Sequence, residues 1–312
     1  MELIQLREDV FLLRGGTNAG VVRTQSGEVM LVDSGLDASV GRRISKQLKS
    51  AGLKLGWIVT THSHADHIGA NRFLQEEHDC EILASPLEAP WIENSSLEAL
   101  ALFGYAEPPR AMMTKFLLAE QSKVSGYAFP PQLEVGGTVV TVLDLAGHSP
   151  GQVGILYNGV LFCGDAVFGP QVIQKHPVVF HSSVSRALAT LESLKKLSDN
   201  LIVVPGHGSF FGPGSYPFKK VVDINIAALR RVQQLVLECV QLKAPTAAPT
   251  EEIFSQVCRA FSCWPHGLGE YCLMRTAVCA HLSHLEQLDV LEAVISDHGL
   301  CWKLRNSVSQ RQ

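Results

Sequence analysis

Seven side chains of the kinds that bind metal ions fall in four short segments of this 312-residue chain. Four of them stand within six residues, at 62–67, and the other three follow much later in the chain. Neutral imidazole and carboxylate groups together serve a borderline-soft divalent ion such as zinc well, and the same ligands can hold iron or manganese. The pattern predicts a metal site. The seven residues are His62, His64, Asp66, His67, His148, Asp165 and His207.

Each of the four segments comes directly after an apolar, strand-like run. Residues 57–61 precede the first segment, and similar runs precede His148, Asp165 and His207. Four strands can therefore deliver all seven side chains to one edge of a sheet. His62 and His64 are two residues apart, so an extended backbone can aim both imidazoles at one ion, while Asp66 and His67 point toward a second.

The rest of the first 215 residues alternates strand and helix signals. Short strand-like runs and turns open the chain, and helical apolar spacing follows at Val40, Ile44 and Leu48. Strand signals resume at 139–143, 153–157 and 160–163, and the last two are joined by the hairpin dipeptide Asn158-Gly159. This order predicts an α+β fold in which sheets pack together with helices outside.

Two further regions interrupt or follow this pattern. Residues 86–130 read as a mostly helical insertion, which is either an ordinary packed segment or an apolar wall over the metal site bearing Phe103, Met112 or Phe116. Beyond 215, three helical segments and a hairpin predict a small winged-helix-like module. We therefore expect a catalytic domain at 1–215 and a C-terminal domain at 216–312.

The ligand motifs resemble those of the metallo-β-lactamase superfamily over residues 1 to about 215. The resemblance implies a four-layer αββα sandwich that binds two metal ions. It implies that His62, His64 and His148 form the first site, that Asp66, His67 and His207 form the second, and that Asp165 bridges them. Asp33 matches an early aspartate of the family that supports the site without binding metal.

Departures within the superfamily narrow the expected activity. Its true β-lactamases typically replace one of these ligands, often by cysteine, and its flavo-diiron members have a glutamate at the position of His64. The ligand set is similar to that of glyoxalase-II-type thioesterases, although no basic C-terminal cluster stands ready to clamp glutathione. The C-terminal module is similar to that of β-lactamase-like-2 hydrolases and endoribonucleases.

The leading hypothesis is a dinuclear metal-dependent hydrolase of a small ester or thioester. Two ions bridged by Asp165 would share a water and lower its pKa, giving a metal-bridging hydroxide that Asp66 helps to orient. Lys175, His176 and His181, on the loop after Asp165, are candidate substrate-binding residues. The alternatives are a phosphodiesterase or endoribonuclease with the same two metals, and a regulatory protein that uses the metals for binding only.

Composition limits the partners and the compartment. The net charge of −4 offers no basic face to a phosphate backbone, and the helix expected before the hairpin has Arg275 as its one fixed cation. Nucleic acid is therefore disfavoured, and a packing or homodimerisation role is favoured for the module. The N-terminus does not read as a secretory signal, and no apolar run reaches the ~20 residues of a membrane span, so we expect a cytoplasmic protein.

Overall fold

The structure is a computed structural model of the chain, and it describes residues 1–305. The strands are β1 (Glu2–Arg7), β2 (Val10–Arg14), β3 (Ala19–Arg23), β4 (Val29–Val32), β5 (Leu55–Val59), β6 (Glu81–Ala84), β7 (Gly126–Tyr127), β8 (Gln132–Val135), β9 (Thr138–Asp144), β10 (Val153–Tyr157), β11 (Val160–Phe162), β12 (Ile202–Val204), β13 (Ala248–Pro249), β14 (Leu291–Ser296) and β15 (Gly299–Leu304). The α-helices are α1 (Ala38–Ser50), α2 (Ala65–Ile68), α3 (Asn71–His78), α4 (Ala89–Glu93), α5 (Ser96–Leu102), α6 (Pro170–Lys175), α7 (Val184–Leu194), α8 (Phe218–Gln241), α9 (Thr250–Phe261) and α10 (Leu268–Gln287). Short 3-10 turns are η1 (Arg110–Met112) and η2 (Gly164–Ala166).

Two sheets form the body of the molecule. The larger has the order β1-β2-β3-β4-β5-β6-β7, antiparallel as far as β4 and parallel from β4 to β7. The smaller has the order β12-β11-β10-β9-β8, in which β11 and β12 are parallel. Asn158 and Gly159, with φ of 45° and 73°, make the tight turn between β10 and β11. That turn conformation suits the right-handed twist of a hairpin, as the dipeptide predicted.

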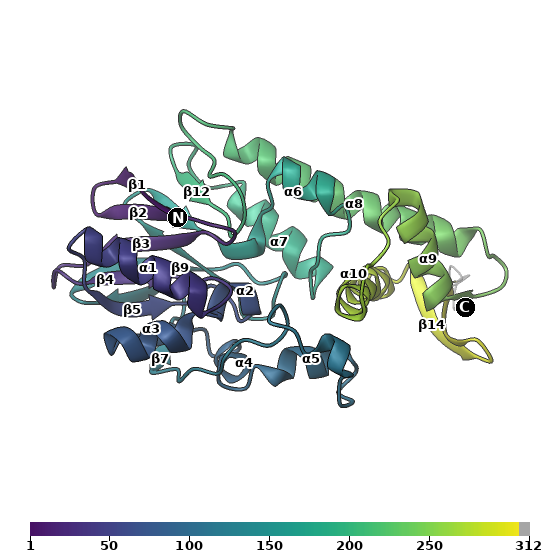
Figure 1. Cartoon of the computed structure of the whole chain (residues 1–312). Helices are drawn as coiled ribbons and strands as arrows, with labels where there is room; N and C mark the ends of the chain where they lie inside the picture. The colour runs from purple at the N-terminus through teal and green to yellow at the C-terminus, as the bar shows by residue number, and fades with distance from the viewer. Residues whose placement is uncertain (306–312) are drawn as a thin grey trace.

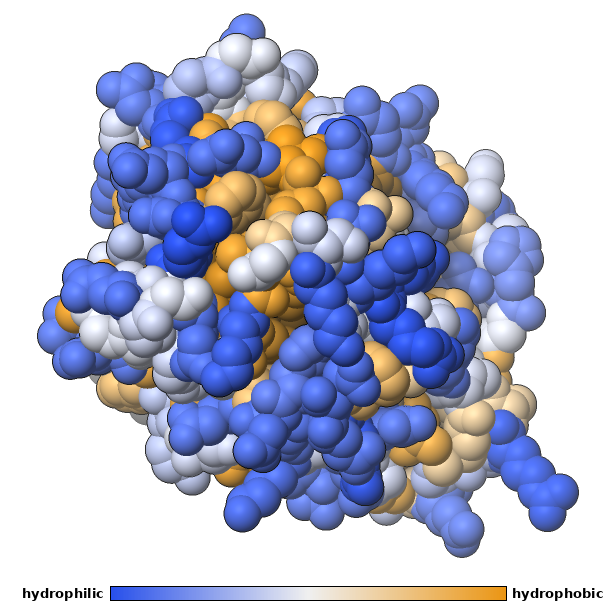
Figure 2. Space-filling view, turned by 60° about the vertical axis from the view of Figure 1, so that its left-hand side comes forward, coloured by the Kyte–Doolittle hydropathy of each residue, from blue (hydrophilic) through white to orange (hydrophobic). Residues whose placement is uncertain are grey.

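The two sheets face each other and helices cover their outer faces (Figure 1). Apolar side chains from both sheets, such as Leu12, Val142 and Ile155, make the layer between them. A second layer packs α1 and α3 on the larger sheet through residues such as Ile44 and Leu74, and a third packs α7 and α8 on the smaller. The predicted α+β, four-layer αββα sandwich is confirmed. Figure 2 shows apolar side chains gathered in a band between hydrophilic flanks on one face of the molecule.

The ligand segments lie at one end of this sandwich, but they come from both sheets. The segment that starts at His62 follows β5 of the larger sheet, whereas His148, Asp165 and His207 follow β9, β11 and β12 of the smaller. Delivery to one edge of a single sheet was therefore wrong. The strand runs look alike in sequence, and only the pairing of strands distributes them between two sheets.

The C-terminal region contains α8, α9, α10 and a three-stranded sheet of order β13-β15-β14. This is the winged-helix-like arrangement of helices followed by a hairpin that the sequence predicted. Its own apolar core includes Val236, Phe254, Val278 and Trp302. The proposed boundary at residue 216 falls just before α8, and residues 306–312 of that proposed domain lie outside the described residues. Within residues 1–305, every helix is too short or too polar to cross a membrane.

Besides α8, which covers the smaller sheet, a second helix of this region reaches back to the sandwich. Helix α10 contacts α5 and η1 of the 86–130 insertion, and it also contacts α7. The contact with the insertion is apolar, because Met112 and Leu117 pack against Cys272 and its neighbours on α10. The C-terminal region and the insertion therefore form one continuous wall beside the end of the sandwich.

Candidate metal centre

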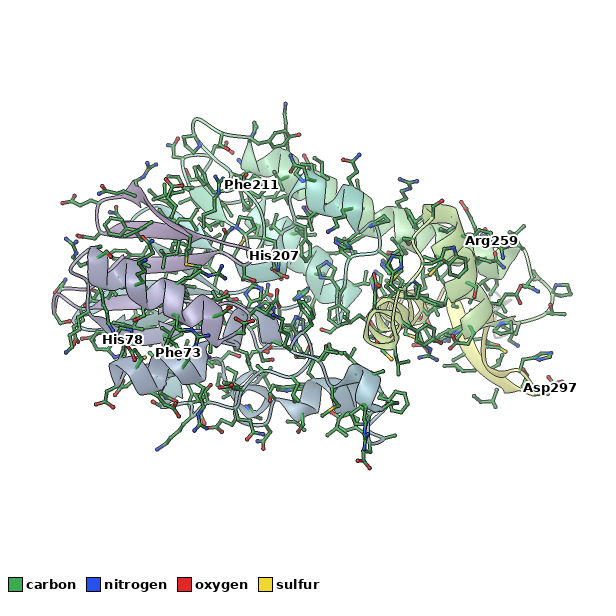
Figure 3. All side chains as sticks on the ribbon, viewed as in Figure 1. Phe73, His78, His207, Phe211, Arg259 and Asp297 are labelled. Carbon is green, nitrogen blue, oxygen red and sulfur yellow. The ribbon has the colours of Figure 1, made fainter. Side chains whose placement is uncertain are left out.

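The structure gathers all seven predicted ligands at the end of the sandwich. They fall into three sets whose ligand atoms lie within 4.8 Å of one another. His207, labelled in Figure 3, marks the place, at the end of the sandwich nearer α10. The sets are His62 with His64 and His148; Asp66 with His67 and His207; and His62 with His67 and Asp165.

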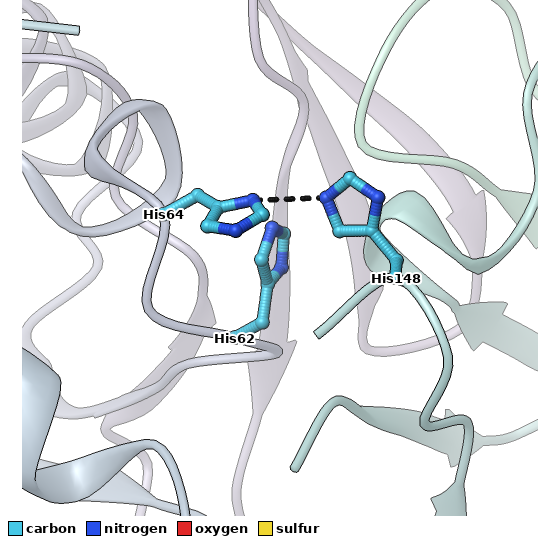
Figure 4. A group of neighbouring side chains, drawn as sticks. All are labelled: His62, His64 and His148. Carbon is cyan, nitrogen blue, oxygen red and sulfur yellow. Dashed lines mark hydrogen bonds between the residues drawn. The ribbon is translucent and has the colours of Figure 1, made fainter. Parts of the chain in front are cut away.

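The first set consists of three imidazoles (Figure 4), and two of them, His62 and His148, have hydrogen-bond partners outside the set. His62 Nδ1 lies 3.1 Å from the hydroxyl of Thr61, which leaves its Nε2 facing the centre. His148 Nδ1 donates to the carbonyl of Phe180 at 2.8 Å, and its Nε2 lies 2.9 Å from Nδ1 of His64. Such outer partners set the tautomer and the direction of a metal-binding histidine.

The second set is supported by Asp33, as the sequence suggested. His67 Nδ1 lies 2.8 Å from Oδ2 of Asp33, and the same carboxylate accepts hydrogen bonds from the backbone and hydroxyl of Thr61. Asp33 holds this position with a φ of 62°, a backbone conformation that costs about 1 kcal/mol or more in a residue other than glycine. His207 Nδ1 donates to the carbonyl of Gly16 at 2.9 Å, and its Nε2 lies 3.0 Å from Oδ2 of Asp66.

Asp165 stands between the two sets. Its Oδ1 lies 3.4 Å from Nε2 of His67, and its Oδ2 lies 3.5 Å from Nε2 of His207 and 3.7 Å from Nε2 of His148. The approach of these groups requires glycine at 206, where a Cβ atom would stand 2.2 Å from Oδ1 of Asp165. The geometry is that of a carboxylate shared by two sites.

Burial and neighbouring charge act differently on the two sets. Burial lowers the pKa of the His62 and His148 imidazoles well below the usual range. Burial opposes protonation of His207 as well, but the carboxylates of Asp165 and Asp66 raise its pKa to about 10. The pKa of Asp165 is well below its usual value because the facing imidazoles outweigh burial. Neutral imidazole and ionised carboxylate are the forms that bind metal, and burial already favours the neutral imidazole at His62 and His148.

The donor atoms at the centre fit divalent ions. In the described part of the chain, Nε2 of His62 and of His67 and Oδ1 of Asp165 are buried without a hydrogen-bond partner. Buried polar atoms nearly always have partners, and these three belong to the same cluster of imidazoles and carboxylates. Ions shared among the sets would satisfy all of them.

Glu88 is a functional residue that the sequence did not suggest. It is 1% exposed, and its two carboxylate oxygens accept hydrogen bonds from Ser63, Ser149 and Gly151. Ser63 lies between His62 and His64, and Ser149 follows His148, so one carboxylate ties two ligand loops together. A glutamate in an ordinary helical context gives no local signal of this role.

Asn18 does the same for the loop of His207. Its side-chain amide donates to the carbonyls of Pro205 and Gly208 at 2.9 and 2.8 Å. Its backbone N–H donates to the carbonyl of Gly206 at 2.7 Å. The turn between β2 and β3 therefore positions a ligand nearly two hundred residues further along the chain.

An apolar cavity of about 160 Å³ adjoins the first set of ligands at His64 and His148. The insertion supplies Trp91 and Leu102 to its wall, and α10 supplies Leu273 and Thr276, so the insertion does lie over the site. The expected wall residues were wrong in detail. Met112 is fully buried in the contact with α10 and Phe103 lines neither cavity beside the centre, whereas Phe116 does line a cavity, a second one that reaches the centre at Asp66 and His207.

The three candidate substrate-binding residues lie in different surroundings. His181 is 3% exposed, and its ring stands against His148 with the ring centroids 5.8 Å apart. Lys175 and His176 are exposed at the end of α6 and line neither cavity beside the centre. The structure thus brings His181 to the ligands and leaves the other two outside; contact with substrate stays a prediction for all three.

Known proteins with similar sequences match the part of the chain that contains the seven predicted ligands. A family model described as the metallo-beta-lactamase superfamily matches residues 12–207. The hydroxyacylglutathione hydrolase GloC of Haemophilus influenzae is 24% identical over 198 residues, which are 62% of this chain and 86% of that protein. A hydroxyacylglutathione hydrolase of Thiobacillus denitrificans is 27% identical over 189 residues, which are 60% of each chain.

Solved structures match nearly the whole chain at lower identity. A beta-lactamase domain protein from Burkholderia ambifaria has a TM-score of 0.73 at 19% identity, covering 97% of this chain and 93% of that one. A metallo-beta-lactamase family protein from Thermus thermophilus has a TM-score of 0.71 at 18% identity, covering 96% and 100%. The shared fold therefore extends into the C-terminal helices.

Proposed function

The chain belongs to the metallo-beta-lactamase superfamily and is a metal-dependent hydrolase, and we propose that it uses two divalent metal ions to hydrolyse a small ester or thioester. The first ion would be held by His62, His64 and His148, the second by Asp66, His67 and His207, with Asp165 between them; zinc suits these ligands. Bound ions supply Lewis acidity and an activated water to such a reaction.

The apolar cavity beside His64 and His148 is the observation that favours an acyl substrate. Among the described residues that line it there is no lysine or arginine, and its walls include Trp91, Leu102 and Leu273. An apolar cleft next to a few polar groups is typical of a small-molecule site. A phosphodiester or RNA bound in this apolar cavity would need cationic side chains on its wall. Arg275, the one fixed cation of α10, is paired with Glu251 at 2.6 Å.

The similarity to hydroxyacylglutathione hydrolases supports thioesters as the first substrates to try. Hydrolysis of a thioester consumes one water and gives a carboxylic acid and a thiol. Asp66 is placed to accept a hydrogen bond from the attacking water, because its carboxylate faces the centre and its Oδ2 is held by His207 and Thr17. The proton released from the water ends on the sulfur of the leaving thiol.

The test is metal analysis of the purified protein followed by assay of that preparation against acyl thioesters, lactones, phosphodiesters and RNA. We expect two equivalents of a divalent ion and turnover of acyl substrates. Asp165→Ala should lower the bound metal and reduce kcat by more than about 100-fold, since even outer partners of metal ligands are worth 10- to 100-fold. Full metal content and activity in that variant would contradict the assignment.

A further inference from the structure

A second cavity of about 390 Å³ adjoins the metal centre through different ligands from the apolar one. It reaches the centre at Asp66 and His207, whereas the apolar cavity reaches it at His64 and His148. Among the described residues the two cavities share no lining side chain. A substrate whose scissile bond lies at the centre can therefore place one part in each cavity.

The second cavity combines apolar wall residues, Leu36, Val40 and Phe116, with two cations. The cations are Arg14, at the end of β2, and Arg43, on α1, and Asp66 is the one acidic lining residue among the described residues. Arg14 donates to the hydroxyl of Ser209 at 3.3 Å. Within residues 1–305 neither guanidinium forms an ion pair with a carboxylate.

The nearby carboxylate of Asp37 is not directed at either arginine. Asp37 follows the lining residue Leu36, and it pairs with Lys115, which precedes the lining residue Phe116, at 2.9 Å. The turn residues Gly15 and Gly16 line the floor between Arg14 and His207. Guanidinium groups bind phosphate and carboxylate through two parallel N–H donors, so two free arginines in one cavity favour an anion.

We infer that Arg14 and Arg43 form a subsite for an anionic group, phosphate or carboxylate, on the leaving group of the substrate, whose acyl group occupies the apolar cavity. The inference rests on the proposed acyl hydrolysis, because it divides that substrate between the two cavities. The apolar cavity cannot take the charged part, since its wall offers no cation and burying an unpaired charge is costly.

The experiment compares thioesters that share one acyl group and differ in the thiol. Butyryl-coenzyme A presents phosphates, S-butyrylglutathione presents carboxylates, and S-butyryl-N-acetylcysteamine is neutral. Arg14→Ala and Arg43→Ala should each lower the ratio of kcat/KM for an anionic thioester over the neutral one by about fivefold, mainly through KM, as expected for partly exposed charge pairs. The two anionic substrates then tell phosphate from carboxylate recognition.

Arg42→Ala is the matched control. Arg42 precedes Arg43 on α1, but its guanidinium lies 5.6 Å from the ring centroid of Phe73, which stands well away from His207 in Figure 3. The control should leave the ratio unchanged. Equal effects of Arg42→Ala and Arg43→Ala would overturn the inference, because net charge alone would then explain the result.

A binding measurement with unreactive analogues tests the subsite independently of the proposed hydrolysis. The S-methyl derivatives of coenzyme A and glutathione cannot react, and calorimetry with the metal-loaded protein should give a Kd for one of them that weakens about tenfold in the Arg14→Ala/Arg43→Ala variant and at higher salt. If such binding occurs but no thioester is hydrolysed, the proposed function fails and the subsite stands. If thioesters are hydrolysed and neither arginine affects the ratio or the Kd, the subsite is wrong and the function stands.

Discussion

The two cavities that meet at the metal centre differ in both chemistry and origin. The one at His64 and His148 is apolar, and its walls come from the insertion and from α10. The one at Asp66 and His207 is larger and carries two arginines, and its walls come mainly from the β2–β3 turn and α1. His64 and Asp66 are two residues apart, so a single loop presents one ligand to each cavity.

This difference locates the determinants of specificity. The predicted metal ligands come from short motifs at strand ends, and in the proposed function they determine which bond is broken. The cavity walls come from segments that connect or follow the sandwich, and in the same proposal they determine which molecule reaches the centre. Changing one wall should therefore alter one part of the substrate preference, and the following predictions test whether the two sides are separable.

The largest effect is expected at Glu88, which supports the His148 side. Glu88→Ala should destabilise the protein by about 2 to 4 kcal/mol, because several buried donors lose a charged acceptor at once. It should also lower kcat by about 10- to 100-fold, since the loops of His64 and His148 lose their shared anchor. Chemical denaturation and steady-state kinetics at saturating metal measure the two effects.

The matched control for this change is Glu93→Ala, at the last residue of the short helix α4 that Glu88 precedes. Glu93 is exposed and accepts one hydrogen bond, from the backbone of Val124 at 3.2 Å. Its loss should cost no more than about 0.5 kcal/mol. A Glu88→Ala protein that is destabilised yet fully active below its melting temperature would show that Glu88 holds the fold and not the ligands.

A medium effect is expected from filling the apolar cavity. Ala101 lines it from α5, and Ala101→Phe places an aromatic ring in a space of about 160 Å³. We expect kcat/KM for an octanoyl thioester to fall about tenfold and that for the acetyl thioester to stay within about twofold, in line with pocket discrimination between chain lengths. Kinetics on a series of acyl chain lengths measures this.

Combining Ala101→Phe with Arg43→Ala tests whether the two cavities act independently. The two cavities share no lining residue in the described part of the chain, so the free-energy effects of the two changes should add to within about 0.5 kcal/mol. Strong coupling between them would mean that the cavities act as one pocket.

The smallest effect is expected at His176. This exposed residue lines neither cavity, so His176→Ala should change kcat and KM by less than about twofold across the thioester panel. A larger change confined to KM would show that substrate extends from the centre to the end of α6.

The sequence predicted the ligands and the layers because both are encoded locally. A histidine or aspartate just after an apolar run is visible without knowing what the strand pairs with, and the periodicity of strands and helices indicates a sandwich. Asp33 was also visible, since it stands at the end of a strand. What these motifs could not reveal is that β5 and the strands before the later ligands belong to different sheets.

The positioning residues that sequence reasoning did not identify contact partners far away along the chain. The donors to Glu88 lie 25 residues before it and 61 and 63 residues after it, and Asn18 serves a loop 187 residues later. Each looks like an ordinary polar residue in its own segment. Met112 shows the opposite error, because an apolar residue in an insertion reads as a wall of the site when it is part of a packing contact with α10.

Helix α10 is synthesised after all seven predicted ligands, and this order affects how the metal centre is assembled. The last ligand, His207, leaves the ribosome some sixty residues ahead of the first residue of α10, Leu268, and domains generally fold from the N-terminus as they emerge. We therefore expect the seven ligands to assemble while the His148 side still lacks its wall from α10. Until Leu273 and Thr276 are in place, that side offers ions a further approach to the centre besides the second cavity.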